Sequence, residues 1–261
     1  MACKVIMVTS FKGGVGKSTV AANMALAFAQ NGKRTMLVDC DFRMRSLDIL
    51  LGVENDIVYD ISDAMADRCP LEKAVIRDKR CDNLLFLPAP YNYRGGIDEE
   101  SFSSVLEQAK ESLSLDYIIL DTPGSSGQEH TAVTKNSDSA YIVATHSFPS
   151  IRAAECTGKE LEDMFINDRK LIINMFDTSG KDIDRKPSVV EIIDQTSIKL
   201  GGIIPYDSKI TLMQDEGVML DSVKESNIAK AFINIAKREE GKNVPLFTGF
   251  RGINRRKLLN I

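Results

Sequence analysis

The fold is decided by residues 5–19, which read VIMVTSFKGGVGKST. The first five form a short apolar run that predicts a buried β-strand, and the apolar spacing over Thr19–Ala29 predicts a helix. Between them lie three glycines, which let the backbone fold so tightly that successive N–H groups point inward at the start of the helix. The sequence therefore predicts a cradle for phosphate oxygens between the first strand and the first helix.

The last residues of this turn indicate a nucleotide. Lys17 is placed to reach the β- and γ-phosphates, and the Ser18 hydroxyl is placed to ligate Mg²⁺. The strict phosphate-loop pattern has glycine at position 11, where this chain has Phe11. Other α/β folds also use glycine-rich turns, but the Gly-Lys-Ser ending between a strand and a helix favours a nucleotide site. The predicted phosphate contacts are Gly13, Gly14, Val15, Gly16, Lys17, Ser18 and Thr19.

Short apolar runs alternate with stretches of helical spacing along the rest of the chain. The predicted strands are Val5–Thr9, Thr35–Asp39, Leu84–Leu87, Tyr117–Leu120, Tyr141–Ala144, Leu171–Ile173 and Gly202–Ile204. The predicted helices are Thr19–Ala29, Phe102–Leu113, Ile151–Phe165, Ser188–Ile198 and Ile228–Ala236. Strands that are nearly all apolar imply a mostly parallel sheet covered on both faces by helices. We predict a single, doubly wound α/β domain over 1–237, a linker over 238–245 and a basic tail over 246–261.

Composition excludes several classes of protein. Of 261 residues, 43% are hydrophobic and 27% charged, which is typical of a globular chain and not of a disordered one. The net charge of −4 does not favour nucleic-acid binding. Five cysteines without paired spacing indicate reduced thiols rather than disulfides or a zinc ribbon. No apolar run approaches the ~20 residues of a membrane span, and no signal peptide is present, so we expect a cytoplasmic protein.

The extra lysine in the loop carries further information. The segment Lys12-Gly-Gly-Val-Gly-Lys-Ser-Thr19 resembles the deviant Walker A motif of the MinD/ParA family of P-loop ATPases. The resemblance implies that Lys12 reaches the phosphates of a partner subunit in an ATP-bound homodimer. By position alone, Lys12 is equally compatible with a solvated side chain at the outer edge of the loop. The cofactors that the resemblance implies are ATP or ADP with Mg²⁺, with a slow intrinsic hydrolysis suited to a switch.

Carboxylates follow two of the predicted strands. Asp39 and Asp41 lie at the end of one, and Asp121 closes another in the manner of a Walker B strand. Ligands of open parallel sheets bind beyond the carboxyl ends of the strands, and residues two apart on a strand face the same way. Asp39 and Asp41 are therefore candidates for the metal, for the nucleophilic water or for each other, beside the alternative of two solvated acids.

The family resemblance assigns roles to these carboxylates. It implies that Asp39 lies near Mg²⁺ and that Asp41, in the first switch, positions the attacking water. Asp121 suits a water-mediated contact to Mg²⁺. We therefore assign catalysis to Lys12, Lys17 and Asp41, and metal binding to Ser18, Asp39 and Asp121.

Two further sets of residues follow from the resemblance. Pro123 and Gly124 resemble the second switch, whose backbone follows the γ-phosphate, although the sequence Ser125-Ser-Gly127 departs from the usual one. The positions that match the adenine contacts of the family are Asn174, Pro205 and Asp207.

Segments along most of the chain resemble the MinD branch of the family. Residues 38–52 and 83–88 are examples. The branch implies an ATPase that dimerises on ATP, cycles on the inner face of the cell membrane to position the division site, and works with MinC- and MinE-like regulatory proteins. A FlhG-like flagellar-placement ATPase and a ParA-like DNA-partition ATPase are the alternatives, and the acidic balance disfavours the latter. An iron–sulfur carrier is disfavoured because Cys156 is the last cysteine.

The C-terminal segment 246–261 has four basic residues and no acid. On a helical wheel, Phe250, Ile253, Leu258 and Ile261 share one arc, which is the pattern of a helix that lies on anionic lipid. Two copies in an ATP dimer would bind through avidity, so that the protein would be cytoplasmic and peripheral on the membrane. The alternative is a frayed basic terminus without a partner. His130 and His146 have no second ligand nearby in the sequence and are expected on the surface or in loops.

Overall fold

The computed structural model describes residues 3–91, 93, 95, 97–177, 185–208, 210 and 226–246 of the chain. Eight strands form one sheet in the order β3-β4-β2-β5-β1-β6-β7-β8. Every pair of neighbours is parallel except β3 and β4, which are antiparallel. The predicted single, mostly parallel, doubly wound α/β domain is confirmed.

The strands are longer at several ends than the sequence predicts. They are β1 (Lys4–Thr9), β2 (Thr35–Asp39), β3 (Ile76–Arg77), β4 (Leu84–Leu87), β5 (Tyr117–Asp121), β6 (Ser139–Thr145), β7 (Arg169–Phe176) and β8 (Lys199–Pro205). β1 lies between β5 and β6 near the middle of the sheet and is almost wholly buried. Because the central strands run parallel, their carboxyl ends meet at one edge, where Thr9, Asp39 and Asp121 lie.

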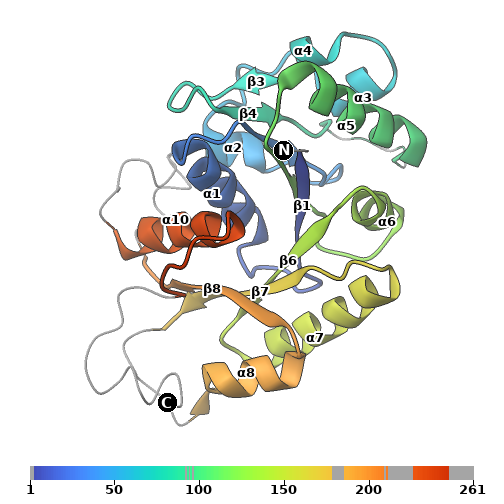
Figure 1. Cartoon of the computed structure of the whole chain (residues 1–261). Coiled ribbons are helices and arrows are strands. Elements are labelled where there is room, and N and C mark those ends of the chain that lie inside the picture. Colours follow the sequence, from blue (N-terminus) through green and yellow to red (C-terminus); the bar gives the residue numbers. More distant parts are fainter. Residues whose placement is uncertain are drawn as a thin grey trace.

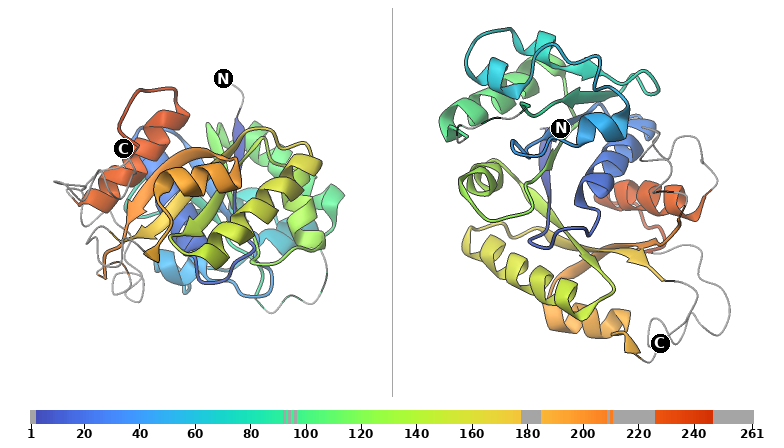
Figure 2. Two further views of the ribbon diagram at one scale, coloured as in Figure 1. Left: turned by 90° about the horizontal axis from the view of Figure 1, so that it is seen from below. Right: turned by 180° about the vertical axis from the view of Figure 1, so that it is seen from behind.

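The helices form a layer on each face of the sheet. They are α1 (Lys17–Gln30), α2 (Leu47–Leu51), α3 (Ile61–Met65), α4 (Leu71–Ala74), α5 (Glu99–Leu113), α6 (Gln128–Lys135), α7 (Phe148–Asp163), α8 (Val189–Thr196) and α10 (Asn227–Glu239). α1, α2 and α10 cover one face, and α5, α6, α7 and α8 cover the other (Figures 1 and 2). Each layer buries its own apolar core against the sheet.

The first helix is buried almost all round because it lies between the sheet and α10. Its residues Val20–Ala29 are all buried, and Phe28 stacks on Tyr117 with 4.3 Å between ring centroids. The helix ends at Gln30, and Gly32 takes the left-handed conformation with φ 82°. Glycine adopts that conformation without steric cost, which explains why the helix ends here.

Residues 238–246 contact the edge strand β8 at their two ends. The last helix runs to Glu239, Arg238 donates to the carbonyl of Gly201, and the carbonyl of Leu246 accepts the Ile203 N–H at 3.2 Å. The segment expected as a linker thus begins within the last helix, and its residues 241–243 are exposed. Residues 247–261 of the expected tail lie outside the described residues. No described helix has the length and apolarity that crossing a bilayer needs.

Candidate nucleotide-binding site

The phosphate loop joins β1 to α1 at the carboxyl edge of the sheet. Gly14 and Gly16 have φ of 75° and 80°, a conformation that L side chains rarely adopt. Gly16 caps the helix without a side-chain hydrogen bond to the first turn. The N–H groups of that turn therefore keep their capacity to donate to an anion, and the helix dipole favours negative charge there.

Asn174 braces this loop from the end of β7. Its Nδ2 donates to the carbonyl of Val15 at 2.8 Å, and a Cβ on Gly16 would lie 2.5 Å from the same nitrogen. Glycine at position 16 is thus required both by φ and by the close approach of Asn174. The resemblance implies an adenine contact for Asn174, and the structure adds a bond to the loop that the sequence does not reveal.

The residues assigned to adenine lie together in one small pocket. Asn174, Pro205 and Asp207 line it with Thr19 of α1 and Phe232 of α10. The pocket lies beside the phosphate loop, because Asn174 lines the pocket and also donates to Val15 of the loop. An apolar wall with a few polar groups is the composition that holds a base.

Lys17 and Ser18 both interact with Asp121. Lys17 Nζ lies 3.1 Å from Asp121 Oδ1, and the Ser18 hydroxyl is near enough to the same carboxylate to lower its pKa. Burial raises the pKa of Asp121 above its ordinary value, although the charge of Lys17 acts in the opposite direction. The second oxygen, Oδ2, is buried without a hydrogen-bond partner. A buried carboxylate oxygen without a partner, next to a serine hydroxyl, fits Mg²⁺ with its bound water.

Asp39 lies opposite Asp121 in the register of β2 and β5 and is fully buried. Its Oδ1 accepts the Asp41 N–H at 3.0 Å, and its Oδ2 accepts the N–H groups of Ser46 and Leu47 at 3.3 Å each. Burial and the neighbouring Asp121 raise the pKa of Asp39 to about 8. The carboxyl group therefore organises the loop 40–47 as well as lying close to the assigned metal position.

Asp41 is folded onto its own loop. Its Oδ1 accepts the N–H groups of Arg43 and Met44 at 3.2 and 3.0 Å. This is an Asx-type turn, which Asp forms readily. Its side chain is half-buried at the edge where Asp39 and Asp121 lie. Both bonds use Oδ1 alone, so Oδ2 keeps its capacity to accept from a water molecule.

The second lysine of the loop lies outside this cluster. Lys12 is exposed, its N–H donates to Ser10 Oγ at 3.2 Å, and its ammonium makes no ion pair within the described part of the chain. Gly13 and Gly14 beside it are exposed as well. The two loop lysines thus differ in surroundings, with Lys17 turned to Asp121 and Lys12 at the surface.

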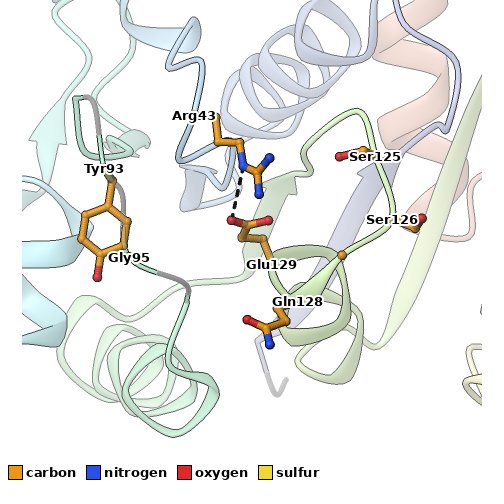
Figure 3. A pocket seen from close by; sticks show the side chains of 8 residues that line it. Arg43, Tyr93, Gly95, Ser125, Ser126, Gln128 and Glu129 are labelled. Atoms are coloured by element: carbon orange, nitrogen blue, oxygen red, sulfur yellow. Dashed lines mark ion pairs between the residues drawn. The ribbon is translucent and has the colours of Figure 1, made fainter.

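The second switch begins at the end of β5. Thr122 donates from N–H and hydroxyl to the carbonyl of Val8, Pro123 is buried, and Gly124 is exposed. After it, residues 125–129 line a cavity of about 570 Å³ with Arg43 and Tyr93. Figure 3 shows Arg43 of the first switch pointing to Glu129, with 3.7 Å between Nε and Oε1. Both switch segments therefore face one cavity.

The expectation of a surface or loop position is wrong for His130, which is buried on helix α6; His146 does lie in the loop after β6, although its side chain is buried there. His130 is 1% exposed, and His146 is 7% exposed and stacked on Phe176. His130 Nε2 lies 3.1 Å from Thr9 Oγ1, at the entrance to the phosphate loop. Burial and the charge of Lys17 lower the pKa of His130 to about 4. Sequence reasoning missed this residue because its partner lies 121 positions away.

The cysteines do not gather into a metal site. Cys40 is buried, Cys156 is exposed, and the other three are half-buried. Within the ranges described, no group of three or more His, Cys, Asp or Glu side chains could by itself hold an ion. A Mg²⁺ ion that is bound mainly through phosphates and water needs no such group.

Known proteins resemble this chain over most of its length. Residues 2–239 match the ParA family, described as an NUBPL iron-transfer P-loop NTPase. The septum site-determining protein MinD of Synechocystis sp. is 38% identical over 244 residues, which cover 93% of this chain and 91% of that protein. Among solved structures, the MinC:MinD cell division protein complex of Aquifex aeolicus matches with a TM-score of 0.87 and 34% identity, over 95% of this chain and 100% of that chain.

A second solved structure is a complex with Mg-ADP. The septum site-determining protein MinD of Pyrococcus horikoshii, complexed with Mg-ADP, matches with a TM-score of 0.77 over 91% of this chain and 96% of that chain. At 24% identity this likeness shows the fold alone.

Proposed function

The chain belongs to the MinD septum site-determining ATPases of the ParA family of P-loop NTPases, and from this premise we propose that ATP closes two copies of it face to face. As a member of that family it binds nucleotide with Mg²⁺ and is a cell-division ATPase. The proposal concerns how this chain couples the nucleotide to assembly, to the membrane and to partner proteins.

The contrast between the two loop lysines carries the proposal. Lys17 is 11% exposed and paired with Asp121, so it is in place to receive phosphates bound by its own loop. Lys12 is exposed at the rim of the same loop, and its ammonium has no carboxylate within ion-pair distance in the part of the chain that the structure describes. An exposed ammonium beside a triphosphate site can pair with an anion that another molecule supplies. We assign that anion to the nucleotide of a second copy.

Each remaining site residue then has a role. The backbone of 13–19 holds the phosphates, and Ser18 and Asp121 hold Mg²⁺, which would neutralise the charge on the transferred phosphoryl group. Asp39 supports the metal position while it holds the first switch in shape through three backbone N–H groups. Asp41 orients the attacking water through Oδ2, the oxygen that its Asx-type turn does not use. Lys12 of the second copy adds positive charge in the transition state.

Partner and membrane contacts follow from the family. The Aquifex relative forms a complex with MinC, so we propose a MinC-like partner for this chain and a MinE-like regulator beside it. We propose further that the basic tail binds anionic lipid through Arg251, Arg255, Arg256 and Lys257. Each basic residue near such a surface contributes about 1 kcal/mol, so two tails in one dimer bind far more strongly than one. The protein would then reside on the inner face of the membrane only while ATP holds the dimer.

Light scattering during size-exclusion chromatography tests the dimer. With Mg²⁺ and a non-hydrolysable ATP analogue the chain is expected to elute at twice its monomer mass, and with ADP as a monomer. Lys12→Ala is expected to stay monomeric with both nucleotides while it still binds ADP. A monomer of the unmutated chain at saturating analogue would overturn the proposal.

Sedimentation with vesicles tests the membrane contact. The analogue-bound chain is expected to sediment with vesicles that contain anionic lipid, and a chain truncated after Leu246 is expected to stay in the supernatant while it still dimerises. Retention on nonspecific DNA that survives the truncation would instead indicate a ParA-like partition ATPase.

A further inference from the structure

An aromatic side chain stands at the entrance to the phosphate loop. Phe11 occupies the position at which the strict phosphate-loop pattern has glycine. Its ring lies 5.0 Å from the ring of His130, centroid to centroid, at an angle of 57°. Tilted aromatic pairs at this separation attract each other beyond their buried area. Phe11 is thus fixed to another part of the molecule, whereas a glycine there would have no side chain to fix.

His130 is anchored in the helix that follows the second switch. It lies on α6, which starts one residue after Gly127 and covers the sheet face opposite α1 (Figure 1). The side chain is 1% exposed. From there it contacts both Thr9 and Phe11, the two residues that flank Ser10.

The hydrogen bonds of His130 favour one of its two nitrogens as the one that carries the proton. The Thr134 hydroxyl donates its hydrogen to the His130 carbonyl at 2.8 Å, so toward the His130 Nδ1, 3.5 Å away, it can only accept. A neutral ring with its proton on Nδ1 leaves Nε2 to accept from the Thr9 hydroxyl at 3.1 Å. The lowered pKa of His130 agrees with a neutral ring. Lys17 is the nearby cation, and Glu160 Oε1 lies 4.0 Å from Nδ1.

These contacts lead through Ser10 to Lys12. His130 holds Thr9 by a hydrogen bond and Phe11 by ring contact, and Ser10 Oγ accepts the Lys12 N–H at 3.2 Å. The backbone that presents Lys12 is therefore restrained on the side away from Gly13 and Gly14. Restraint before binding lowers the entropy that an assembly must lose.

We propose that His130 is a positioning residue, which, with Thr9 and Phe11, holds the outer end of the phosphate loop so that Lys12 is presented to a second copy of this chain. This inference rests on the proposed function, because Lys12 matters here only if it acts across the dimer. The contacts of His130 also connect α6, the helix after the second switch, to the loop segment that carries Lys12. It does not involve the phosphate contacts of the monomer.

The test separates assembly from nucleotide binding in the monomer. The variants are Phe11→Gly, His130→Ala and the double variant, with His130→Gln as the conservative change whose amide oxygen still accepts from Thr9. The measurements are the dimer dissociation constant with the non-hydrolysable analogue, by analytical ultracentrifugation, and the affinity for a fluorescent ADP. Thr35→Val is the matched control, because Thr35 is a buried strand-end threonine at the opposite edge of the sheet.

We expect Phe11→Gly and His130→Ala each to raise the dimer dissociation constant about tenfold, with ADP affinity changed by less than about twofold. The double variant is expected to equal His130→Ala, because that change already removes the ring contact with Phe11 together with the bond to Thr9. His130→Gln is expected to fall between His130→Ala and the unmutated chain, and Thr35→Val to leave the dimer constant unchanged. Additive effects, or equal losses in ADP affinity and dimerisation, would overturn the inference.

The outcome for Lys12→Ala distinguishes this inference from the proposal on which it rests. If Lys12→Ala dimerises normally, the proposed function fails. If Lys12→Ala stays monomeric while Phe11→Gly and His130→Gln dimerise like the unmutated chain, only the role of His130 is wrong. Should His130→Ala fail to fold, Phe11→Gly alone decides, because Phe11 is half-buried on the surface side of the loop.

Discussion

Lys17 and Asp121 form an ion pair beneath the phosphate loop, with 3.1 Å between Nζ and Oδ1 and side chains only 11% and 1% exposed. In the absence of phosphates the carboxylate provides the negative charge that the buried ammonium requires, because an unpaired buried charge is costly. When a nucleotide binds, its phosphates offer Lys17 a second anionic partner. Asp121 is then available to Mg²⁺ through the oxygen that has no partner.

Asp121→Asn is expected to uncouple nucleotide affinity from Mg²⁺. The neutral amide cannot hold the ion as a carboxylate does, so the gain in affinity that Mg²⁺ gives should fall by about tenfold or more. Titration calorimetry with Mg²⁺ and with EDTA measures the two affinities. Asp116→Asn is the control, since Asp116 precedes the same strand at its other end and is 41% exposed. An unchanged response to Mg²⁺ would rule out Asp121 as part of the metal site.

Gly16→Ala and Gly32→Ala are expected to differ although both glycines have φ near 80°. An added Cβ meets nothing within 4 Å at Gly32, but at Gly16 it lies 2.5 Å from Asn174 Nδ2. Gly32→Ala should cost about 1 kcal/mol of backbone strain. Gly16→Ala should cost about 1–3 kcal/mol more and lose nucleotide binding, because Asn174 must release Val15. Urea unfolding compares the two, and equal destabilisation would contradict the packing argument.

The buried His130 predicts a pH dependence of stability. Its pKa is lowered to about 4 in the folded chain, below the value of about 6.5 for an exposed histidine. Between these values the unfolded chain binds a proton that the folded chain does not, so the free energy of unfolding rises with pH from about 4 to 6.5. His130→Gln should lack this rise. Compared with the unmutated chain at the same pH, the variant should therefore be more stable at pH 4.5 than it is at pH 7. Parallel stability curves for the two proteins would show that the ring is not held neutral.

The buried Glu239 also makes stability depend on pH, in a more acidic range than His130 does. Its side chain is 2% exposed and accepts from Lys4 at 2.6 Å, from Tyr141 at 2.6 Å and from Lys170 at 2.9 Å. These partners outweigh burial and hold the pKa of Glu239 below its ordinary value. Its contribution is complete above the unfolded pKa of about 4.3 and disappears as the pH falls through the folded pKa.

Glu239→Gln should therefore destabilise the protein by about 3 kcal/mol at pH 7 and by much less at pH 3. Chemical unfolding at both values measures the difference. Glu240→Gln, at the neighbouring position with only the Lys242 pair among its described ion pairs, is the control. A loss that is equal at both pH values would mean that Glu239 stabilises the fold through its packing and not through its charge.

The sequence predicts best where its signals are local. The unit from β1 to β2 follows from an apolar run, three glycines and the Asn31-Gly32 ending, all within forty residues. The predicted elements do not include the two-residue strand β3, the helices α2, α3 and α4 of four or five residues, or the eight-residue α6, because such short segments show no clear period. The carboxyl-edge aspartates were predicted because parallel strands end on one side.

Long-range contacts account for what the sequence did not reveal. The bond from Asn174 to Val15 joins residues 159 positions apart, and no local pattern marks it. The burial of His130 depends likewise on Thr9 and Phe11, which the fold alone brings near. The bonds that Asp41 makes to Arg43 and Met44 are local by contrast, because Asp readily forms a turn with the backbone two residues on.

The hydrogen bond from Ile203 to Leu246 has a practical consequence for shortening this protein. β8 ends the sheet, and its outer side would otherwise present unpaired backbone groups to solvent. Open strand edges recruit other chains and lead to aggregation. A truncated protein that stops before Leu246 would uncover part of this edge and precipitate for reasons unrelated to lipid. Stopping after Leu246 retains the cover, so that solubility and membrane affinity can be measured independently.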